Sequence, residues 1–208
     1  LMPMVGLGAV LVAAVAAPLI AEAFSPLLQW REGVYIASGF AGILGMTLLL
    51  VQPLLATGAL PLTQSRARRV HRMTGALRLA AVVVHVAGLW ITSPPDVIDA
   101  LPFTSPTPFS VWGVIAMWAV FAAALMAALR KRLPLRPMTW RQMHVALALI
   151  IAGGTIAHAL LIQGTMEVVT KYALSLLVAL AAIRVVLHIR WRPRCRGLGL
   201  GCPLVHQL

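Results

Sequence analysis

The chain has 208 residues, of which 61% are hydrophobic and only 11% are charged. A soluble domain of this length needs about 25% charged residues to cover its surface, so the composition excludes an ordinary water-soluble fold. We therefore expect an all-α integral membrane protein, because helices satisfy their own backbone hydrogen bonds in lipid.

Six apolar segments are each long enough to cross a bilayer. A helix needs about 20 mostly apolar residues to span a hydrocarbon core of roughly 30 Å. Pro53 is expected to kink or end the second segment, and Arg184 interrupts the sixth and must face an interface or the protein interior. The sequence predicts a six-transmembrane-helix bundle with spans at residues 1–24, within 33–62, and at 71–91, 107–129, 142–163 and 168–189.

The first segment also carries a weak signal for cleavage. Ala21, Glu22 and Ala23 resemble the small-x-small pattern of a signal-peptidase site. A secretory signal would have a positively charged region before its apolar core, and none is present. We expect the first helix to be retained.

Charged residues alternate between the connecting segments. Three segments are rich in arginine: the one between the second and third spans, the one between the fourth and fifth, and the one after the sixth. The segment between the third and fourth spans has Asp96 and Asp99 and no Lys or Arg. With six spans the basic segments lie on one side, which the positive-inside rule makes cytoplasmic. We expect a multi-pass protein of a bacterial inner membrane with a cytoplasmic C-terminus.

The net charge of +12 follows from the same rule. Topology determinants that face anionic headgroups account for it better than nucleic-acid binding does, because there is no basic recognition helix. The expected partner is the lipid bilayer and not nucleic acid. Residues 1–190 are expected to form one transmembrane domain, and residues 191–208 a short basic cytoplasmic tail.

Four of the six histidines form two pairs with the same spacing. His71 and His85 are 14 positions apart, and so are His144 and His158. In a helix this interval returns a side chain to nearly the same face, about 21 Å further along the axis. The third and fifth spans run parallel, so we expect His71 to face His144 near the cytoplasm and His85 to face His158 nearer the outside.

Paired imidazoles inside a helical bundle fit the axial positions of b-type haem. We predict two stacked, non-covalent haems between the third and fifth spans, since no Cys-x-x-Cys-His motif is present for covalent attachment. A single intramembrane histidine would also be consistent with a buried hydrogen-bonding group, a proton relay or an interfacial residue. Zinc is disfavoured because ligands about 21 Å apart cannot share one ion. His188 and His206 lack partners at this interval and are expected to be interfacial or solvated.

Residues beside the histidines give weaker signals. Arg68 and Arg141 each lie three positions before the first histidine of their helix, and Arg72 directly follows His71. These arginines would bind haem propionates or act only as ordinary positive-inside residues. Gly75 and Gly88 follow the two histidines of the third span, where glycine leaves room for a flat ring or for a neighbouring helix.

The histidine pairs and the run RVHRMTG at positions 69–75 resemble the ferric reductase-like transmembrane domain. That superfamily includes ferric reductases, NADPH oxidases and the haem subunit of the bacterial periplasmic methionine sulfoxide reductase system. The resemblance covers residues 4–190 and implies that His71, His85, His144 and His158 are axial haem ligands. Ferric reductases and NADPH oxidases continue into flavin- and nicotinamide-binding domains. Only a short tail follows the sixth span here, so we expect neither site in this chain.

An iron with imidazole at both axial positions has no open site for substrate, which favours one-electron transfer. We expect an oxidoreductase component that carries electrons from a separate cytoplasmic flavoprotein or quinol to an outer acceptor. Ferric iron, oxygen and a periplasmic reductase partner are the candidate acceptors. The alternatives are a cytochrome b-like quinone-reactive subunit of a respiratory complex and a non-redox membrane scaffold or transporter.

Overall fold

The computed structural model describes residues 2–197, and over that range the chain is all-helical, as the sequence predicts. Seven α-helices and one short 3₁₀ turn follow one another without a strand among the described residues. In chain order they are α1 (Met2–Ala23), η1 (Pro26–Leu28), α2 (Gly33–Ala56), α3 (Gln64–Thr92), α4 (Pro94–Ala100), α5 (Pro108–Ala128), α6 (Pro137–Leu161) and α7 (Val168–Gly197).

Five helices are long and apolar enough to cross a membrane, namely α2, α3, α5, α6 and the Val168–Ile189 part of α7. Helix α1 is also apolar. The part of it whose side chains are described, Gly8–Ala23, is shorter than these five spans. The expectation of a multi-pass integral membrane protein is confirmed. The count of six spans stays a prediction.

Several helix ends differ from the expected ones. Helix α3 begins at Gln64, seven residues before the expected start at His71, because its arginine-rich first turns favour the helical state although they are not apolar. Helix α7 continues to Gly197, so the expected tail begins as helix. Pro53 lies inside α2, which ends soon after it at Ala56. A proline so close to a helix end removes one hydrogen bond without stopping the helix at once.

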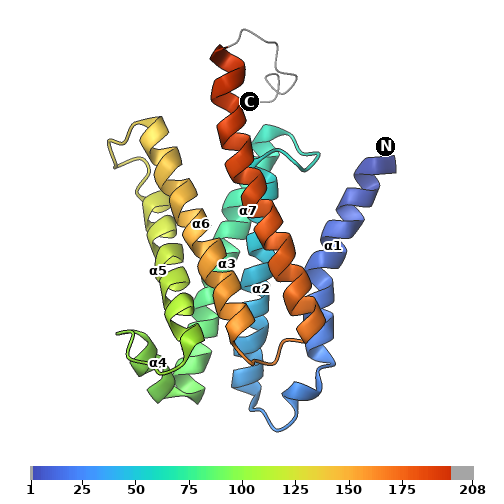
Figure 1. The fold of residues 1–208 in the computed structure, drawn as a ribbon, viewed down its shortest axis with the longest axis vertical. Helices are drawn as coiled ribbons and strands as arrows, with labels where there is room; N and C mark the ends of the chain where they lie inside the picture. Colours follow the sequence, from blue (N-terminus) through green and yellow to red (C-terminus); the bar gives the residue numbers. More distant parts are fainter. Residues whose placement is uncertain (1, 198–208) are drawn as a thin grey trace.

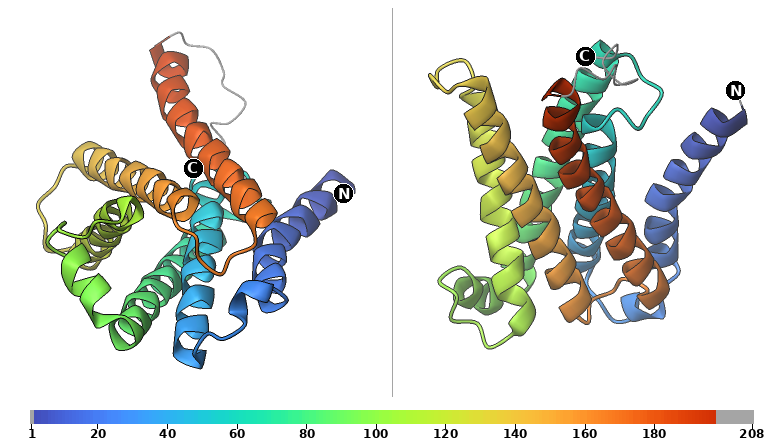
Figure 2. Two further views of the ribbon diagram at one scale, coloured as in Figure 1. Left: turned by 60° about the horizontal axis from the view of Figure 1, so that its bottom comes forward. Right: turned by 45° about the horizontal axis from the view of Figure 1, so that its top comes forward.

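Two antiparallel hairpins form the body of the bundle (Figure 1). Helix α2 packs along α3, and α5 packs along α6. Helix α7 contacts both α2 and α6, and α1 lies against α2 and α7 (Figure 2). Helices α3 and α6 are not among the pairs that pack closely within the described part of the chain. The two histidine-bearing helices are therefore held in place mainly by their neighbours.

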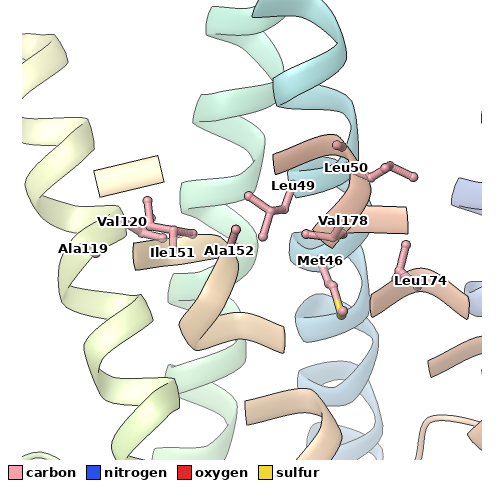
Figure 3. Packing of buried hydrophobic residues seen from close by; sticks show 10 residues of the cluster. Met46, Leu49, Leu50, Ala119, Val120, Ile151, Ala152, Leu174 and Val178 are labelled. Carbon is pink, nitrogen blue, oxygen red and sulfur yellow. The ribbon is translucent and has the colours of Figure 1, made fainter. Parts of the chain in front are cut away.

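An apolar core joins the two hairpins at the middle of the bundle (Figure 3). Helix α7 contributes its most deeply buried residues, Leu174 and Val178, which are 1% and 0% exposed. Because lipid is as apolar as this core, van der Waals packing, and not removal of apolar surface from water, holds the helices together here. The other core residues are Met46, Leu49, Leu50, Ala119, Val120, Ile151, Ala152 and Ala181.

Charge distinguishes the two ends of the bundle. One end, called the basic end here, carries the connections 57–63 and 129–136 and the arginine-rich start of α3. The opposite end, called the acidic end, is where α1, α3 and α6 finish (Figure 1). All five carboxylates of the chain lie at the acidic end, namely Glu22, Glu32, Asp96, Asp99 and Glu167.

Helix α1 is fastened to the bundle at the acidic end. Glu22 is 0% exposed, and a Cβ placed on Gly39 of α2 would lie 3.3 Å from its Oε1. The Ser25 hydroxyl donates to the Thr165 carbonyl over 3.0 Å, which joins the end of α1 to the connection between α6 and α7. Glu22, in the middle of the small-x-small stretch, is thus packed against other parts of the chain, whereas Ala23 is exposed.

Candidate functional site

The structure brings the four paired histidines together across the space between α3 and α6. The ring centroids of His71 and His144 are 6.1 Å apart, with an interplanar angle of 62°. Those of His85 and His158 are 6.5 Å apart, with an angle of 83°. The first couple is called the basic-end pair and the second the acidic-end pair.

Helix geometry and topology together produce this pairing. Fourteen residues are four helical turns less about 40°, so both histidines of one helix face the same neighbour. Helices α3 and α6 both run from the basic end to the acidic end (Figure 1). Their histidines therefore meet at two levels about 21 Å apart along the helix axes.

Backbone carbonyl groups orient both rings of the acidic-end pair. His85 Nδ1 lies 2.8 Å from the Ser38 carbonyl oxygen, and His158 Nδ1 lies 2.9 Å from that of Phe109. A carbonyl oxygen only accepts, so each Nδ1 carries the proton and donates it. This leaves the Nε2 lone pair of each ring available as a ligand, an arrangement in which the second-sphere hydrogen bond also makes the imidazole more basic.

Two glycines allow these rings to approach the neighbouring helices. A Cβ at Gly42 of α2 would lie 2.9 Å from His85 Nδ1, and one at Gly113 of α5 would lie 2.7 Å from His158 Nδ1. Each glycine stands four residues after the carbonyl that its histidine contacts, so the two hairpins repeat one arrangement. Neither glycine was predicted as a site residue, because nothing in the sequence fixes its distance from the histidines.

The basic-end pair is held differently. His71 Nδ1 and His144 Nδ1 are buried, and neither has a hydrogen-bond partner among the described residues. The His144 ring stacks on Trp140, with centroids 6.1 Å apart and an angle of 7°, and the Arg130 guanidinium lies 4.8 Å from the centroid of that indole. Trp140 precedes His144 by one helical turn, a spacing that would have identified it.

Gln52 of α2 supports the backbone around His71. Its Nε2 donates to the His71 carbonyl oxygen over 3.1 Å and to the Thr74 hydroxyl over 2.7 Å. A Cβ at Gly75 would lie 3.5 Å from the same Nε2, which is ordinary contact. Gly75 therefore faces α2 at this point of α3.

The remaining predicted site residues have simpler surroundings. Arg68 and Arg72 are exposed on α3, and Arg141 is half-buried on α6. A Cβ at Gly88 would lie 2.8 Å from the Ser38 Cβ, so Gly88 serves the close packing of α3 on α2. The haem-propionate role of the arginines stays a prediction.

The two pairs fit the axial ligation of haem by the number and kind of their donors. A haem supplies four equatorial nitrogens and takes two axial ligands, which is what each couple offers, whereas a structural zinc site takes four protein ligands. Metal–nitrogen bonds of about 2 Å on each side, added to the two half-rings, account for centroid separations of this size. Within the described residues, no three His, Cys, Asp or Glu side chains gather into one group.

Comparison with known families matches residues 39–155, more than half of the chain, to the family described as "Ferric reductase like transmembrane component". The matched segment contains His71, His85 and His144 and stops three residues before His158. Comparisons with curated proteins and with solved structures find no match. Domains of this kind commonly bind haem, and they suggest a role in membrane electron transfer. The chain therefore belongs to the ferric reductase-like transmembrane family.

Proposed function

We propose that the chain is a di-haem b-type cytochrome that carries electrons across the membrane from the basic end to the acidic end. The observation that carries this proposal is the meeting of four histidines as two facing couples at two depths. By the positive-inside rule the basic end is cytoplasmic. The donor is a separate flavoprotein or quinol, and the acceptor is ferric iron or a periplasmic reductase partner.

In this proposal each couple would hold one haem through its two imidazoles. His71 and His144 bind at the basic-end level, and His85 and His158 bind at the acidic-end level. When bound, the haems supply reversible one-electron chemistry at iron. An iron held in this way by two imidazoles would exchange electrons and not bind substrate, and the apolar core between the levels would exclude water. Residues 1–190 act as one membrane domain.

The proposed cytoplasmic tail is residues 191–208. Its first residues continue α7 to Gly197, while Gly199, Gly201, Cys202 and His206 lie outside the described residues. Neither a flavin nor a nicotinamide site is proposed in this chain.

An apolar groove supports quinol as the second candidate donor. The groove has a volume of about 490 Å³ and lies between α5 and α6 toward the basic end. Met143 and Leu147 line it, and they flank His144 in the sequence. A quinol in the lipid would bind in such a groove, beside the helix that carries His144. Its other lining residues are Ala122, Leu125, Met126, Leu129, Leu133 and Ala146.

A reduced-minus-oxidised optical spectrum of the purified protein tests the proposal. We expect a b-type band and two haems per chain. His85→Ala and His158→Ala should each remove the same haem, and His71→Ala and His144→Ala should each remove the other. His188→Ala, in α7, is the matched control and should keep both. A chain without a b-type band after haem-replete expression would remove the electron-transfer account, and unchanged haem content in the four variants would refute the pairing.

A further inference from the structure

Arg78 stands midway between the two histidines of α3. It follows His71 by seven residues and precedes His85 by seven. Seven residues are two helical turns less about 20°, so the three side chains lie on nearly the same face of the helix. It is also the middle residue of helix Gln64–Thr92, and its side chain is half-buried. The sequence thus places a permanent positive charge between the two histidine levels, on the helix face that carries the histidines.

The chain offers Arg78 no counter-ion at that depth. All five carboxylates of the whole sequence lie at the acidic end, and none of them forms an ion pair with Arg78. A charged side chain in the middle of a bilayer is costly, and such residues usually face the bundle interior and serve a function. Within the described residues, the charge of Arg78 is therefore not offset by a carboxylate.

The charge of Arg78 lies close to the basic-end pair. Side chains on a helix lean toward its N-terminus, and the N-terminus of α3 lies at the basic end (Figure 1). Although Arg78 is equally far along the helix from both levels, its long side chain therefore reaches toward the basic-end level.

We propose that Arg78 sets the reduction potential at the basic-end level by favouring the ferrous state there. This inference rests on the proposed di-haem function. Reduction adds one electron from the donor, moves no proton and breaks no bond, so the net charge of the site falls by one. A fixed positive charge nearby opposes the ferric state more than the ferrous state. At about 10 Å and an effective dielectric constant of about 20, one unit charge changes this equilibrium by roughly tenfold.

The test is a spectroscopic redox titration of purified protein in the His85→Ala background, where only the basic-end haem remains. Arg78→Gln should move the ferric-to-ferrous ratio at fixed ambient potential about tenfold toward ferric, which is about 59 mV for one electron. Arg78→Lys keeps the charge and should keep the wild-type potential. Arg66→Gln, an equal charge change at an exposed position in the first turn of α3, should cause no comparable shift.

The outcomes separate this inference from the proposed function. A wild-type protein without a b-type band would defeat the proposed function itself. Intact haem in Arg78→Gln with an unshifted potential would overturn only the role of Arg78, and so would Arg78→Lys shifting as far as Arg78→Gln. If Arg78→Gln loses the basic-end haem, the Arg78→Lys variant distinguishes the two explanations. Wild-type haem content and potential in Arg78→Lys would support the role of the charge. Loss of the haem in Arg78→Lys would contradict it.

Discussion

The two histidine pairs are alike in the spacing of their ligands and differ in what holds the rings. At the acidic end, both Nδ1 atoms contact backbone carbonyl groups of the neighbouring helix, and a glycine stands beside each ring. At the basic end, both Nδ1 atoms are buried without a hydrogen bond among the described residues, and the support comes from the side chains of Gln52 and Trp140.

The rings of the acidic-end pair are thus supported by the backbone, and those of the basic-end pair by side chains. A backbone carbonyl in a packed helix fixes the tautomer and the direction of an imidazole before any ligand binds, and no substitution of its own side chain removes it. Side-chain support is lost with a single substitution. We therefore expect the acidic-end pair to be sensitive to crowding by its glycines, and the basic-end pair to be sensitive to truncation of its neighbours.

Gly113→Ala is expected to have the largest effect. Its Cβ would lie 2.7 Å from His158 Nδ1 on a packed helix, so the ring must leave its carbonyl partner. Loss of such second-sphere support weakens metal binding by about 10-fold to 100-fold. Haem titration into protein depleted of haem should show weak binding at the acidic-end level and normal binding at the basic-end level. Gly42→Ala, with its Cβ 2.9 Å from His85 Nδ1, should act in the same direction.

The control for these variants is Gly153→Ala in α6, where a Cβ would meet nothing within 4 Å. It should bind both haems normally. If Gly113→Ala also binds both normally, the close contact between α5 and the ring is not what orients His158.

Gln52→Leu is expected to destabilise the basic end by about 1–3 kcal/mol, because the His71 carbonyl and the Thr74 hydroxyl lose a shared donor. Thermal unfolding in detergent, followed by circular dichroism, should show the lower midpoint. Gln142→Leu, an exposed position on α6, should leave the midpoint nearly unchanged. Equal midpoints for the two variants would contradict a supporting role of Gln52.

Trp140→Leu should weaken haem binding at the basic end by a smaller amount, about 0.5–1.5 kcal/mol. This is the contribution of one aromatic pair beyond its buried area. Haem binding at the basic end should weaken while the acidic-end level stays unchanged in the difference spectrum. Trp30, which is 99% exposed, provides the control Trp30→Leu. A loss confined to the acidic-end level would show that stacking on His144 is unimportant.

The smallest expected effect concerns Glu167, before the first residue of α7. Its carboxylate accepts from the backbone N–H groups of Thr170 and Val169, and these bonds hold the pKa of Glu167 below its usual value. Its contribution to stability is therefore complete above the unfolded-state pKa of about 4.3 and is lost as the pH falls through the lower folded-state pKa. Wild-type unfolding midpoints should decline more steeply in this acid range than those of Glu167→Gln. Parallel curves would contradict the capping role.

Much of the fold was predictable because its causes are local to the sequence. The low charged fraction and the apolar segments identify membrane helices, since lipid requires that composition whatever the packing. The start of α3 and the end of α7 could not be placed as well, because a helix continues through polar residues beyond the lipid, as at Gln64 and Gly197.

The intervals in the sequence set which histidines share one face of a helix. A 14-residue interval within a helix fixes both the face and the axial separation of His71 and His85, and the same interval recurs at His144 and His158, because helical geometry is the same everywhere. What surrounds the four rings depends instead on how the helices pack against one another. The Ser38 and Phe109 carbonyls come from other helices, and every residue carries a carbonyl, so only the packing of α2 on α3 and of α5 on α6 selects which two become hydrogen-bond acceptors for the rings.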